Sequence, residues 1–399
     1  MRIVLTAQPA YSHLVPLVLP VARMLHDAGH EVAVATGDQA AAHVEDAGLR
    51  AIRLPNALTM GQLAMDPAYA GLAEIPELMA HDRGRRTIDL RPEVFAHNFI
   101  GVLGHRSAAD LLDVLDGARP DLIVREVTEF GGYIAARKLG IPQAVLDIGP
   151  MAPHGSPEVL AELNGLRADF ELPEIDDPWE AMREFRATVI PEGFYPEQAR
   201  LEARHHYRPP QRRTAPLDPA VAALPDDKPL VLASLGSNAP AMLGDRPQLL
   251  ETIIEALGEM PVTAVAAIGA DREPADWAGP RPDNVHLTPF VQQGALLPAV
   301  DAFITHSGFN STLESFDAGV PMVSIPMFAE QPGNAARITE LGAGLRLNVE
   351  DVTTARLRDA LQQVLEDPGY RARARGVQRR MLALPPLSAI VDDLVAHAS

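Results

Sequence analysis

The sequence predicts an α/β protein with two doubly wound, Rossmann-like domains, each built on a parallel sheet covered by helices. Short and almost continuously apolar runs alternate with segments of helical periodicity, as expected for strands buried on both faces. This alternation stops near residue 208 and restarts near residue 229. The chain has 399 residues, which is enough for two domains that each bury a core.

The first half of the chain holds the first set of alternating segments. The strands expected there are 2–7, 31–37, 49–55, 120–126 and 141–149. The helices expected there are 13–28, 38–48, 107–118 and 129–140. Gly29 stands where a helix C-cap belongs, and Asp38 is a candidate N-cap. Residues 56–105 have weak periodicity, so we expect irregular helices and long loops in that segment.

A proline-rich stretch separates the two halves. Its prolines, which disfavour a helix and a central strand, are at positions 209, 210, 216, 219, 225 and 229. We expect a linker at 208–228, between an N-terminal domain at 1–207 and a C-terminal domain at 229–385. Residues 386–399 have the apolar spacing of a helix, so we expect a terminal helix there. One alternative is that this helix packs back on the N-terminal domain. Beyond the linker the expected strands are 229–237, 262–269, 284–290, 301–308 and 320–326, with a helix at 246–260.

Composition excludes several classes of protein. The net charge is −19 and no long basic block is present, so a surface that follows nucleic-acid phosphates is not expected. The most basic run, 205–213, lies in proline-rich sequence and is expected to be a loop or linker. The absence of cysteine excludes disulfides and cysteine-based zinc sites. There is neither a signal-peptide pattern nor an apolar run of roughly 18 residues, so we expect a cytoplasmic protein that is not integral to a membrane.

The stretch 305–331, "THSGFNSTLESFDAGVPMVSIPMFAEQ", carries the strongest chemical signal. A strand ends in His306 and a glycine turn, and a helix is expected to begin near Phe309 or Asn310. The free amides at such a helix start bind anions. His306, Asn310 and Ser311 add polar side chains there, and Glu314, one turn further on, suits a pair of ribose hydroxyls. An alternative is that Asn310, Ser311 and Thr312 merely cap the helix.

Residues 289–331 resemble the nucleotide-sugar signature of family 1 glycosyltransferases, which have the GT-B fold. The matching segments are "PFVQQGALLP", "HSGFNSTLES" and "GVPMVSIPMFAEQ", in that order. The chain looks most similar to the bacterial branch that glycosylates macrolides and other natural products. The resemblance implies that the N-terminal domain (1–207) binds the acceptor and that the C-terminal domain (229–385) binds the nucleotide sugar. It also implies that the two domains face each other across a cleft.

The resemblance also implies the roles of residues at the donor site. The residues implied to bind the nucleotide diphosphate are Ser237, His306, Gly308, Asn310 and Ser311. Those implied to bind the ribose and base are Glu314, Phe290 and Gln293. Glu330 and Gln331 are implied to read sugar hydroxyls.

A second site is expected after the first strand. His13 in "AQPAYSHLVP" lies where the first helix begins, and the family places its general base there. A histidine suits this task because its ordinary pKa lies near the operating pH. The family's orienting acid corresponds to Glu126, counted back from "LGIP", with Glu129 and Asp110 as alternatives. Glu126 could instead pair with Arg125.

The resemblance implies an inverting, metal-independent transfer of a hexose from a UDP- or TDP-sugar to a hydroxyl of a lipophilic natural product. The nucleotide sugar would be a co-substrate, with no other cofactor, and the protein would be a monomer or homodimer. An NAD(P) oxidoreductase is disfavoured because "TAQPAYSH" contains no glycine. A nucleotide-sugar epimerase and a non-catalytic ligand-binding or activator protein are alternatives. Apolar residues of the expected acceptor region are Met60, Met65, Tyr69, Met79, Phe95, Phe99, Met151, Phe170 and Phe185.

Overall fold

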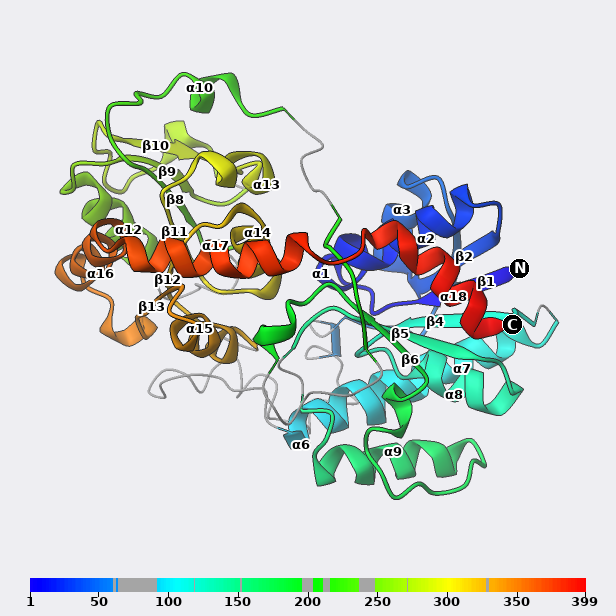
Figure 1. The fold of residues 1–399 in the computed structure, drawn as a ribbon. Helices are drawn as coiled ribbons and strands as arrows, with labels where there is room; N and C mark the ends of the chain where they lie inside the picture. Colours follow the sequence, from blue (N-terminus) through cyan, green and yellow to red (C-terminus); the bar gives the residue numbers. More distant parts are fainter. Residues whose placement is uncertain are drawn as a thin grey trace. The chain divides into compact units, whose positions relative to one another are not determined.

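The structure is a computed structural model that describes residues 1–59, 62–63, 92–117, 119–150, 153–195, 204–210, 216–236, 248–270, 272–327 and 330–399. The chain divides into two compact units. The first holds the described residues up to Pro210 together with Ala383–Ser399, and the second holds the described residues between 211 and 382. Each unit has its own parallel sheet, which confirms the predicted fold class (Figure 1).

The sheet of the first unit has the strand order β3-β2-β1-β4-β5-β6-β7, counting the described residues only. Its strands are β1 (Arg2–Thr6), β2 (Glu31–Gly37), β3 (Arg50–Leu54), β4 (Leu122–Glu126), β5 (Gln143–Asp147), β6 (Phe185–Thr188) and β7 (Arg204–His206). Every described pair of neighbouring strands in it is parallel. The strand order reverses direction between β1 and β4, and this switch point is where open parallel sheets bind ligands.

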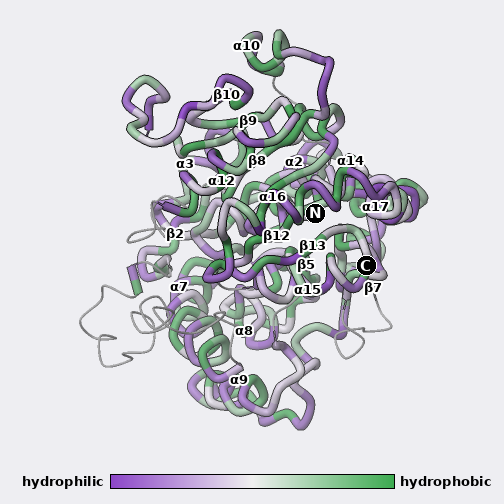
Figure 2. Tube along the Cα trace, turned by 90° about the vertical axis from the view of Figure 1, so that its left-hand side faces the viewer, coloured by the Kyte–Doolittle hydropathy of each residue, from purple (hydrophilic) through white to green (hydrophobic). Residues whose placement is uncertain are grey.

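Helices of the first unit follow the predicted alternation. They are α1 (Tyr11–His13), the π-helix η1 (Leu14–Val18), α2 (Leu19–Asp27), α3 (Asp38–Asp46), α6 (Pro92–Phe95), the π-helix η3 (Ala96–Gly104), α7 (His105–Leu115), α8 (Gly131–Leu139), α9 (Pro157–Asp169) and α18 (Ile390–Ala398). In α9 the buried Val159, Leu163 and Leu166 recur at helical spacing, and Figure 2 shows hydrophobic and hydrophilic residues mixed along it. The terminal helix α18 packs on α2, and its Asp393 accepts a hydrogen bond of 2.6 Å from the hydroxyl of Tyr207.

The second unit repeats this architecture with the strand order β10-β9-β8-β11-β12-β13 in its described residues. Its strands are β8 (Leu230–Ser234), β9 (Thr263–Ala267), β10 (Val285–Thr288), β11 (Ala302–Thr305), β12 (Met322–Ser324) and β13 (Gly344–Arg346). Its helices are α10 (Pro219–Ala222), α12 (Gln248–Gly258), α13 (Gln293–Leu296), α14 (Phe309–Ala318), α15 (Gln331–Glu340), α16 (Thr354–Glu366) and α17 (Pro368–Leu382). Here the switch point lies between β8 and β11.

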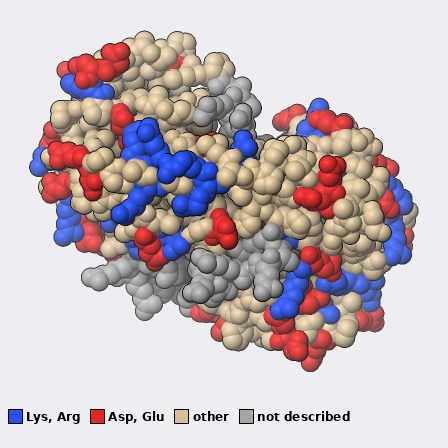
Figure 3. Space-filling model, in the orientation of Figure 1, with Lys and Arg blue, Asp and Glu red and all other residues tan. Residues whose placement is uncertain are grey.

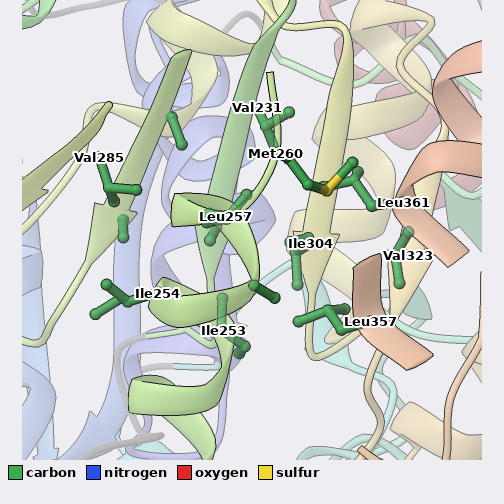
Figure 4. Packing of buried hydrophobic residues seen from close by; sticks show 14 of the residues in the cluster. Val231, Ile253, Ile254, Leu257, Met260, Val285, Ile304, Val323, Leu357 and Leu361 are labelled. Atoms are coloured by element: carbon green, nitrogen blue, oxygen red, sulfur yellow. The ribbon is translucent and has the colours of Figure 1, made fainter. Parts of the chain in front are cut away.

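A hydrophobic core fills one face of the second sheet. Alternate residues of the strands, among them Val231, Ile304 and Val323, point to this face and are fully buried. Helices α12 and α16 cover them with Ile253, Leu357 and neighbouring apolar side chains (Figure 4). This packing holds the carboxyl ends of β8 and β11 in place, and the predicted site residues follow those ends.

Three details of the predicted elements were wrong. Asp38 does not cap α3 but is its first residue, behind the N-cap Gly37, and its carboxylate lies 3.3 Å from Arg53. Within the predicted linker the short helix α10 forms, because proline is tolerated at its first position and Asp218 accepts a bond from the amide of Ala220. The basic run read as loop begins inside strand β7.

Strand β6 was not predicted, and it carries a buried ion pair. Arg186 is 2% exposed and its guanidinium lies 2.5 Å from the carboxylate of the fully buried Asp147 on β5. The same carboxylate oxygen accepts a hydrogen bond of 2.6 Å from the hydroxyl of Tyr195. The guanidinium also lies over the rings of Trp179 and Tyr195. An arginine at a strand centre is therefore accommodated by partners from distant parts of the sequence.

His154 is buried in an aromatic cluster near that ion pair. Its ring centroid lies 5.1 Å from Phe95 and 6.2 Å from Trp179. Neither ring nitrogen has a hydrogen-bond partner in the described part of the chain. Burial lowers the pKa of His154 well below its usual value, and the charges of Arg186 and Arg125 act in the same direction. The imidazole is therefore neutral in the folded protein.

Replacing His154 with phenylalanine is expected to make stability less sensitive to acid. Because the folded-state pKa is lowered, the unfolded chain binds more protons at His154 once the pH falls below its ordinary value of about 6.5. Wild-type stability should therefore fall relative to His154→Phe as the pH falls from about 7 to about 5. Thermal unfolding of both proteins across that range measures the difference, and a difference that stays constant with pH would contradict it. Any packing cost of the larger phenylalanine ring does not depend on pH, so it does not change how the difference in stability varies with pH.

Charge on the described surface is not evenly distributed. Figure 3 shows arginine side chains gathered over α17, where Arg373, Arg375, Arg379 and Arg380 are exposed. They form a local basic patch on a chain whose net charge is −19. None of the described helices is both long enough and apolar enough to span a bilayer.

Candidate functional site

The first group of site residues lies at the switch point of the first sheet. Strands β1 and β4 are neighbours there, with Thr6 and Arg125 as register partners. His13 ends the short helix α1 that follows β1, and Glu126 is the last residue of β4. The structure places Nδ1 of His13 3.2 Å from Oε2 of Glu126. The Glu126 side chain is fully buried, whereas 23% of the His13 side chain is exposed, so the imidazole is accessible.

Thr128 is a third member of this group, and the sequence analysis missed it. Its backbone amide donates to Oε1 of Glu126 at 2.8 Å, and its hydroxyl donates to Oε2 at 2.8 Å. The hydroxyl oxygen also lies 3.2 Å from Nδ1 of His13. One residue thus holds both oxygens of the carboxylate. The only signal in the sequence is a hydroxyl residue two positions after an acid, a pattern typical of local side-chain to backbone bonds.

The two alternative acids have structural partners of their own. Glu129 accepts hydrogen bonds from the amides of Gly131 and Gly132, at 2.7 and 2.8 Å, at the start of α8. Burial raises the pKa of Glu129, and its hydrogen bonds act in the opposite direction. Asp110 accepts bonds from the backbone and side-chain amides of Asn56, at 2.8 and 2.7 Å. Both acids hold loops, whereas Glu126 contacts the histidine.

Arg125, the other possible partner of Glu126, donates its hydrogen bonds mainly to backbone carbonyl groups. Its guanidinium donates to the carbonyl oxygens of Val127 at 3.2 Å, Glu129 at 3.1 Å and Ala181 at 2.6 Å. Burial lowers the pKa of Arg125 to about 10, and the negative charges of Glu129 and Glu126 oppose this shift. The group is still protonated at neutral pH. It therefore fixes the loop that follows β4, while Thr128 binds the carboxylate of Glu126.

The second group of site residues follows β11 at the switch point of the second sheet. There Ser307 adopts a left-handed conformation with φ 63°, which is uncommon for a residue with a side chain. Its amide donates to Oγ1 of Thr305 at 3.2 Å, and its carbonyl accepts from Nδ2 of the buried Asn334 at 3.0 Å. These bonds stabilise a strained turn of the kind found at functional sites. The sequence predicted a glycine turn here, but neither the left-handed conformation of Ser307 nor the role of Asn334 was predicted.

Helix α14 begins directly after this turn. Gly308 is its N-cap, so Asn310 and Ser311 lie in its first turn and do not occupy the capping position. The carboxylate of Glu330, from the start of α15, accepts a hydrogen bond of 3.3 Å from the amide of Phe309. The positive end of the helix dipole lies at this helix start, which suits an anion.

His306 is held between two glycines at this turn. A Cβ atom on Gly236 would lie 2.7 Å from Nε2 of His306, and one on Gly308 would lie 2.4 Å from the same atom. Gly236 also has φ 85°, which side-chain-bearing residues rarely adopt. Burial lowers the pKa of His306 to about 4, and a hydrogen bond with the backbone of Ser234 opposes this shift. The imidazole is therefore neutral at neutral pH and has one N–H to donate.

The residues predicted to bind ribose and base come together on α13 and α14. The side-chain amide of Gln293 donates to Oε2 of Glu314 at 2.6 Å. The hydroxyl of Ser311 lies 3.5 Å from the amide oxygen of Gln293. Phe290 precedes α13 and is 61% exposed, so its ring is available for stacking. These contacts link side chains that are about twenty positions apart in the sequence.

The residues predicted to read the sugar hydroxyls lie at the start of α15. Glu330 reaches the amide of Phe309, as described above. Gln331 is 3% exposed, and its amide oxygen accepts a hydrogen bond of 2.9 Å from the amide of Met327. Both side chains therefore bind backbone amides here, and their roles toward a sugar stay predictions.

Some predicted residues lie outside the described part of the chain or inside the core. Those outside the described residues are Ser237, Met60, Met65, Tyr69, Met79 and Met151. Phe95 is fully buried in a hydrophobic cluster that Phe99 and Phe170 pack against. Phe185 stacks on His205 with ring centroids 4.2 Å apart. The described aromatic residues thus serve packing, and they do not identify an acceptor.

The fold has counterparts among solved glycosyltransferases. The structure titled glycosyltransferase VinC in complex with dTDP matches with a TM-score of 0.77, over 100% of this chain and 99% of that chain. The two sequences are 23% identical, so this similarity establishes the fold alone. The two doubly wound units therefore form the GT-B fold.

Sequence comparison identifies the family. Residues 23–244 match the N-terminal domain, and residues 251–397 the C-terminal domain, of the family described as erythromycin biosynthesis protein CIII-like. The chain belongs to this family, and it is a natural-product glycosyltransferase of the GT-B fold.

Curated relatives agree with this family. The NDP-glycosyltransferase YjiC of Bacillus subtilis is 27% identical, over 93% of this chain and 91% of the relative. The aclacinomycin-T 2-deoxy-L-fucose transferase of Streptomyces galilaeus is 29% identical, over 99% of this chain and 95% of the relative. Family membership favours transfer over the epimerase and non-catalytic alternatives.

Proposed function

We propose that the protein transfers a hexose from a UDP- or TDP-sugar to a hydroxyl group of a lipophilic natural product, such as an antibiotic, a polyketide or an aromatic aglycone. The observation that carries this proposal is the contact between His13 and Glu126 at the switch point of the first sheet. A partly exposed imidazole backed by a buried acid is the arrangement of a general base. The name of the aclacinomycin-T relative supports the class of acceptor.

The proposed reaction is a direct displacement with inversion. Nε2 of His13 takes the proton of the acceptor hydroxyl while the oxygen of that hydroxyl forms a bond to the anomeric carbon. The bond between that carbon and the diphosphate oxygen breaks, and its electron pair leaves with the nucleoside diphosphate. Glu126 stabilises the imidazolium that forms. The acceptor oxygen approaches opposite the leaving group, so the configuration at the anomeric carbon is inverted.

The start of α14 is the proposed binding site of the diphosphate. Its amides and dipole, the N–H of His306, and the side chains of Asn310 and Ser311 would stabilise the charge that develops on the leaving group. We propose that these groups stabilise the leaving group without a metal ion and that no cofactor is needed. Glu314, already bonded by Gln293, would accept hydrogen bonds from the ribose hydroxyls, and Phe290 would stack on the base.

Replacing Gly308 with alanine is expected to weaken nucleoside diphosphate binding by about 10- to 150-fold. The added Cβ would lie 2.4 Å from Nε2 of His306, so the imidazole must leave its position beside the turn. The loss of one hydrogen bond to a charged group corresponds to about 1.5–3 kcal/mol. Calorimetric titration with UDP and TDP measures the change. Gly165→Ala is the matched control, because a Cβ there meets nothing within 4 Å. Equal affinities of Gly308→Ala and Gly165→Ala would contradict the role of His306.

Ligand-induced thermal stabilisation tests the proposed donor class. A ligand that binds only the folded state raises the melting temperature, with about 2.7 kcal/mol of stabilisation at a concentration of about 100 Kd. UDP, TDP, GDP, NAD and NADP are compared at equal concentrations. We expect stabilisation by UDP or TDP and none by NAD or NADP. Stabilisation by the nicotinamide cofactors alone would contradict the proposal.

A further inference from the structure

The bonds around Thr128 determine which ring nitrogen of His13 carries the proton. The hydroxyl of Thr128 has one hydrogen, and it donates this hydrogen to Oε2 of Glu126 at 2.8 Å. Its oxygen therefore faces Nδ1 of His13, 3.2 Å away, with lone pairs only. The carboxylate oxygen of Glu126, also 3.2 Å from Nδ1, is an acceptor as well.

Two acceptors at Nδ1 leave one arrangement for a neutral imidazole. Nδ1 must carry the hydrogen, because an unprotonated Nδ1 would face two acceptor oxygens with no hydrogen between them to form a hydrogen bond. Nε2 then carries the lone pair that a general base needs. With Glu126 alone, the tautomer would depend on a side chain that can rotate about several bonds. The amide and hydroxyl of Thr128 hold one oxygen each and prevent that rotation.

The position of Thr128 is itself fixed from β1. The buried side-chain amide of Gln8, just after β1, donates to the backbone carbonyl of Thr128 at 3.0 Å. This bond ties the segment that leads to His13 to the loop that follows Glu126. The distance between the imidazole and its two acceptors is therefore set by a cross-link between neighbouring strand ends.

We propose that Thr128 is a positioning residue, which selects the Nδ1–H tautomer of His13 and holds Glu126 in the orientation that stabilises it. The consequence for catalysis rests on the proposed function, because Nε2 acts as base only if an acceptor hydroxyl is deprotonated there. The tautomer itself does not depend on any substrate.

The first test reads the tautomer directly. Nitrogen NMR of histidine-labelled protein at about pH 8 distinguishes Nδ1–H from Nε2–H, and a His13→Ala spectrum assigns the signals. We expect Nδ1–H in the wild type and in Thr128→Ser, and a shift toward a tautomer mixture in Thr128→Val. Thr6→Val is the matched control. It removes a hydroxyl bonded to the buried Glu129 in the same unit, and it should leave the His13 signals unchanged.

The second test is kinetic. Thr128→Val should lower kcat about tenfold, part of the roughly 10²–10⁴-fold that a positioned base contributes, with KM for both substrates within about twofold. Thr128→Ser should recover kcat to within about threefold. The proposal would be overturned if Thr128→Val had the same spectrum and the same kcat as the wild type. It would also be overturned if Thr128→Ser lost as much activity as Thr128→Val. An inactive wild type whose tautomer still depends on Thr128 would contradict the proposed function and support the positioning role.

Discussion

Replacing His13 with alanine is expected to lower kcat of glycosyl transfer about 10³-fold and to leave UDP and TDP affinity within about twofold. A general base contributes about 10²–10⁴-fold, and the loss should lie in this range because the acceptor hydroxyl must then lose its proton to water. Donor affinity should persist because the residues proposed to bind the nucleotide belong to the second unit. Steady-state kinetics and calorimetric titration measure the two quantities separately.

His26→Ala is the matched control for the His13 variant. His26 lies further along the same helical segment, in α2, and its exposed imidazole lies 3.3 Å from the carboxylate of the neighbouring Asp27. It should keep wild-type kcat. An unchanged kcat in His13→Ala would remove His13 from the mechanism, while loss of nucleotide binding in His13→Ala would show that the substitution disturbs more than proton transfer.

Replacing Arg186 with methionine is expected to destabilise the first unit by about 3–5 kcal/mol. The substitution leaves the carboxylate of Asp147 fully buried with its charge uncompensated, and removing one partner of a buried ion pair costs this much. The contacts of the guanidinium with Trp179 and Tyr195 are lost as well. Denaturant unfolding followed by circular dichroism measures the change.

A double substitution separates the charge from the packing at Arg186. Asp147→Asn removes the uncompensated charge but keeps an oxygen that the hydroxyl of Tyr195 can bond. Asp147→Asn combined with Arg186→Met should therefore be more stable than Arg186→Met alone. A double variant that is less stable than Arg186→Met would mean that packing, and not the buried charge, dominates the loss.

Strands with a continuous apolar run were predictable from the sequence, and short strands without one were not. Strands β1, β2, β4 and β8 each contain three or four consecutive apolar residues between helix signals. Strands β6 and β7 have three or four residues and contain arginine and histidine, which single-sequence patterns assign to loops. Arg186 fits inside β6 because Asp147 neutralises it, and that pairing becomes visible only once the strands are adjacent.

The candidate site was predictable where spacing along the chain carries the information. His13, Glu126 and the turn before α14 lie at or just after strand ends, and neighbouring strand ends at the switch point of one sheet are brought together by topology. Thr128 and Asn334 were missed because their roles depend on where one hydrogen-bonding group points in three dimensions. The tight space around His306 was also invisible, since it comes from glycines of two different loops.

The most direct test of this account is the structure of the product formed by the purified protein. The protein is incubated with UDP-α-glucose or TDP-α-glucose and a set of polyketide and aromatic aglycones, and products are analysed by mass spectrometry and proton NMR. The account predicts an aglycone that has gained one hexose through an oxygen, in the inverted β configuration. An α-linked product, or release of free sugar and nucleoside diphosphate with every acceptor, would contradict direct displacement by a hydroxyl that His13 deprotonates.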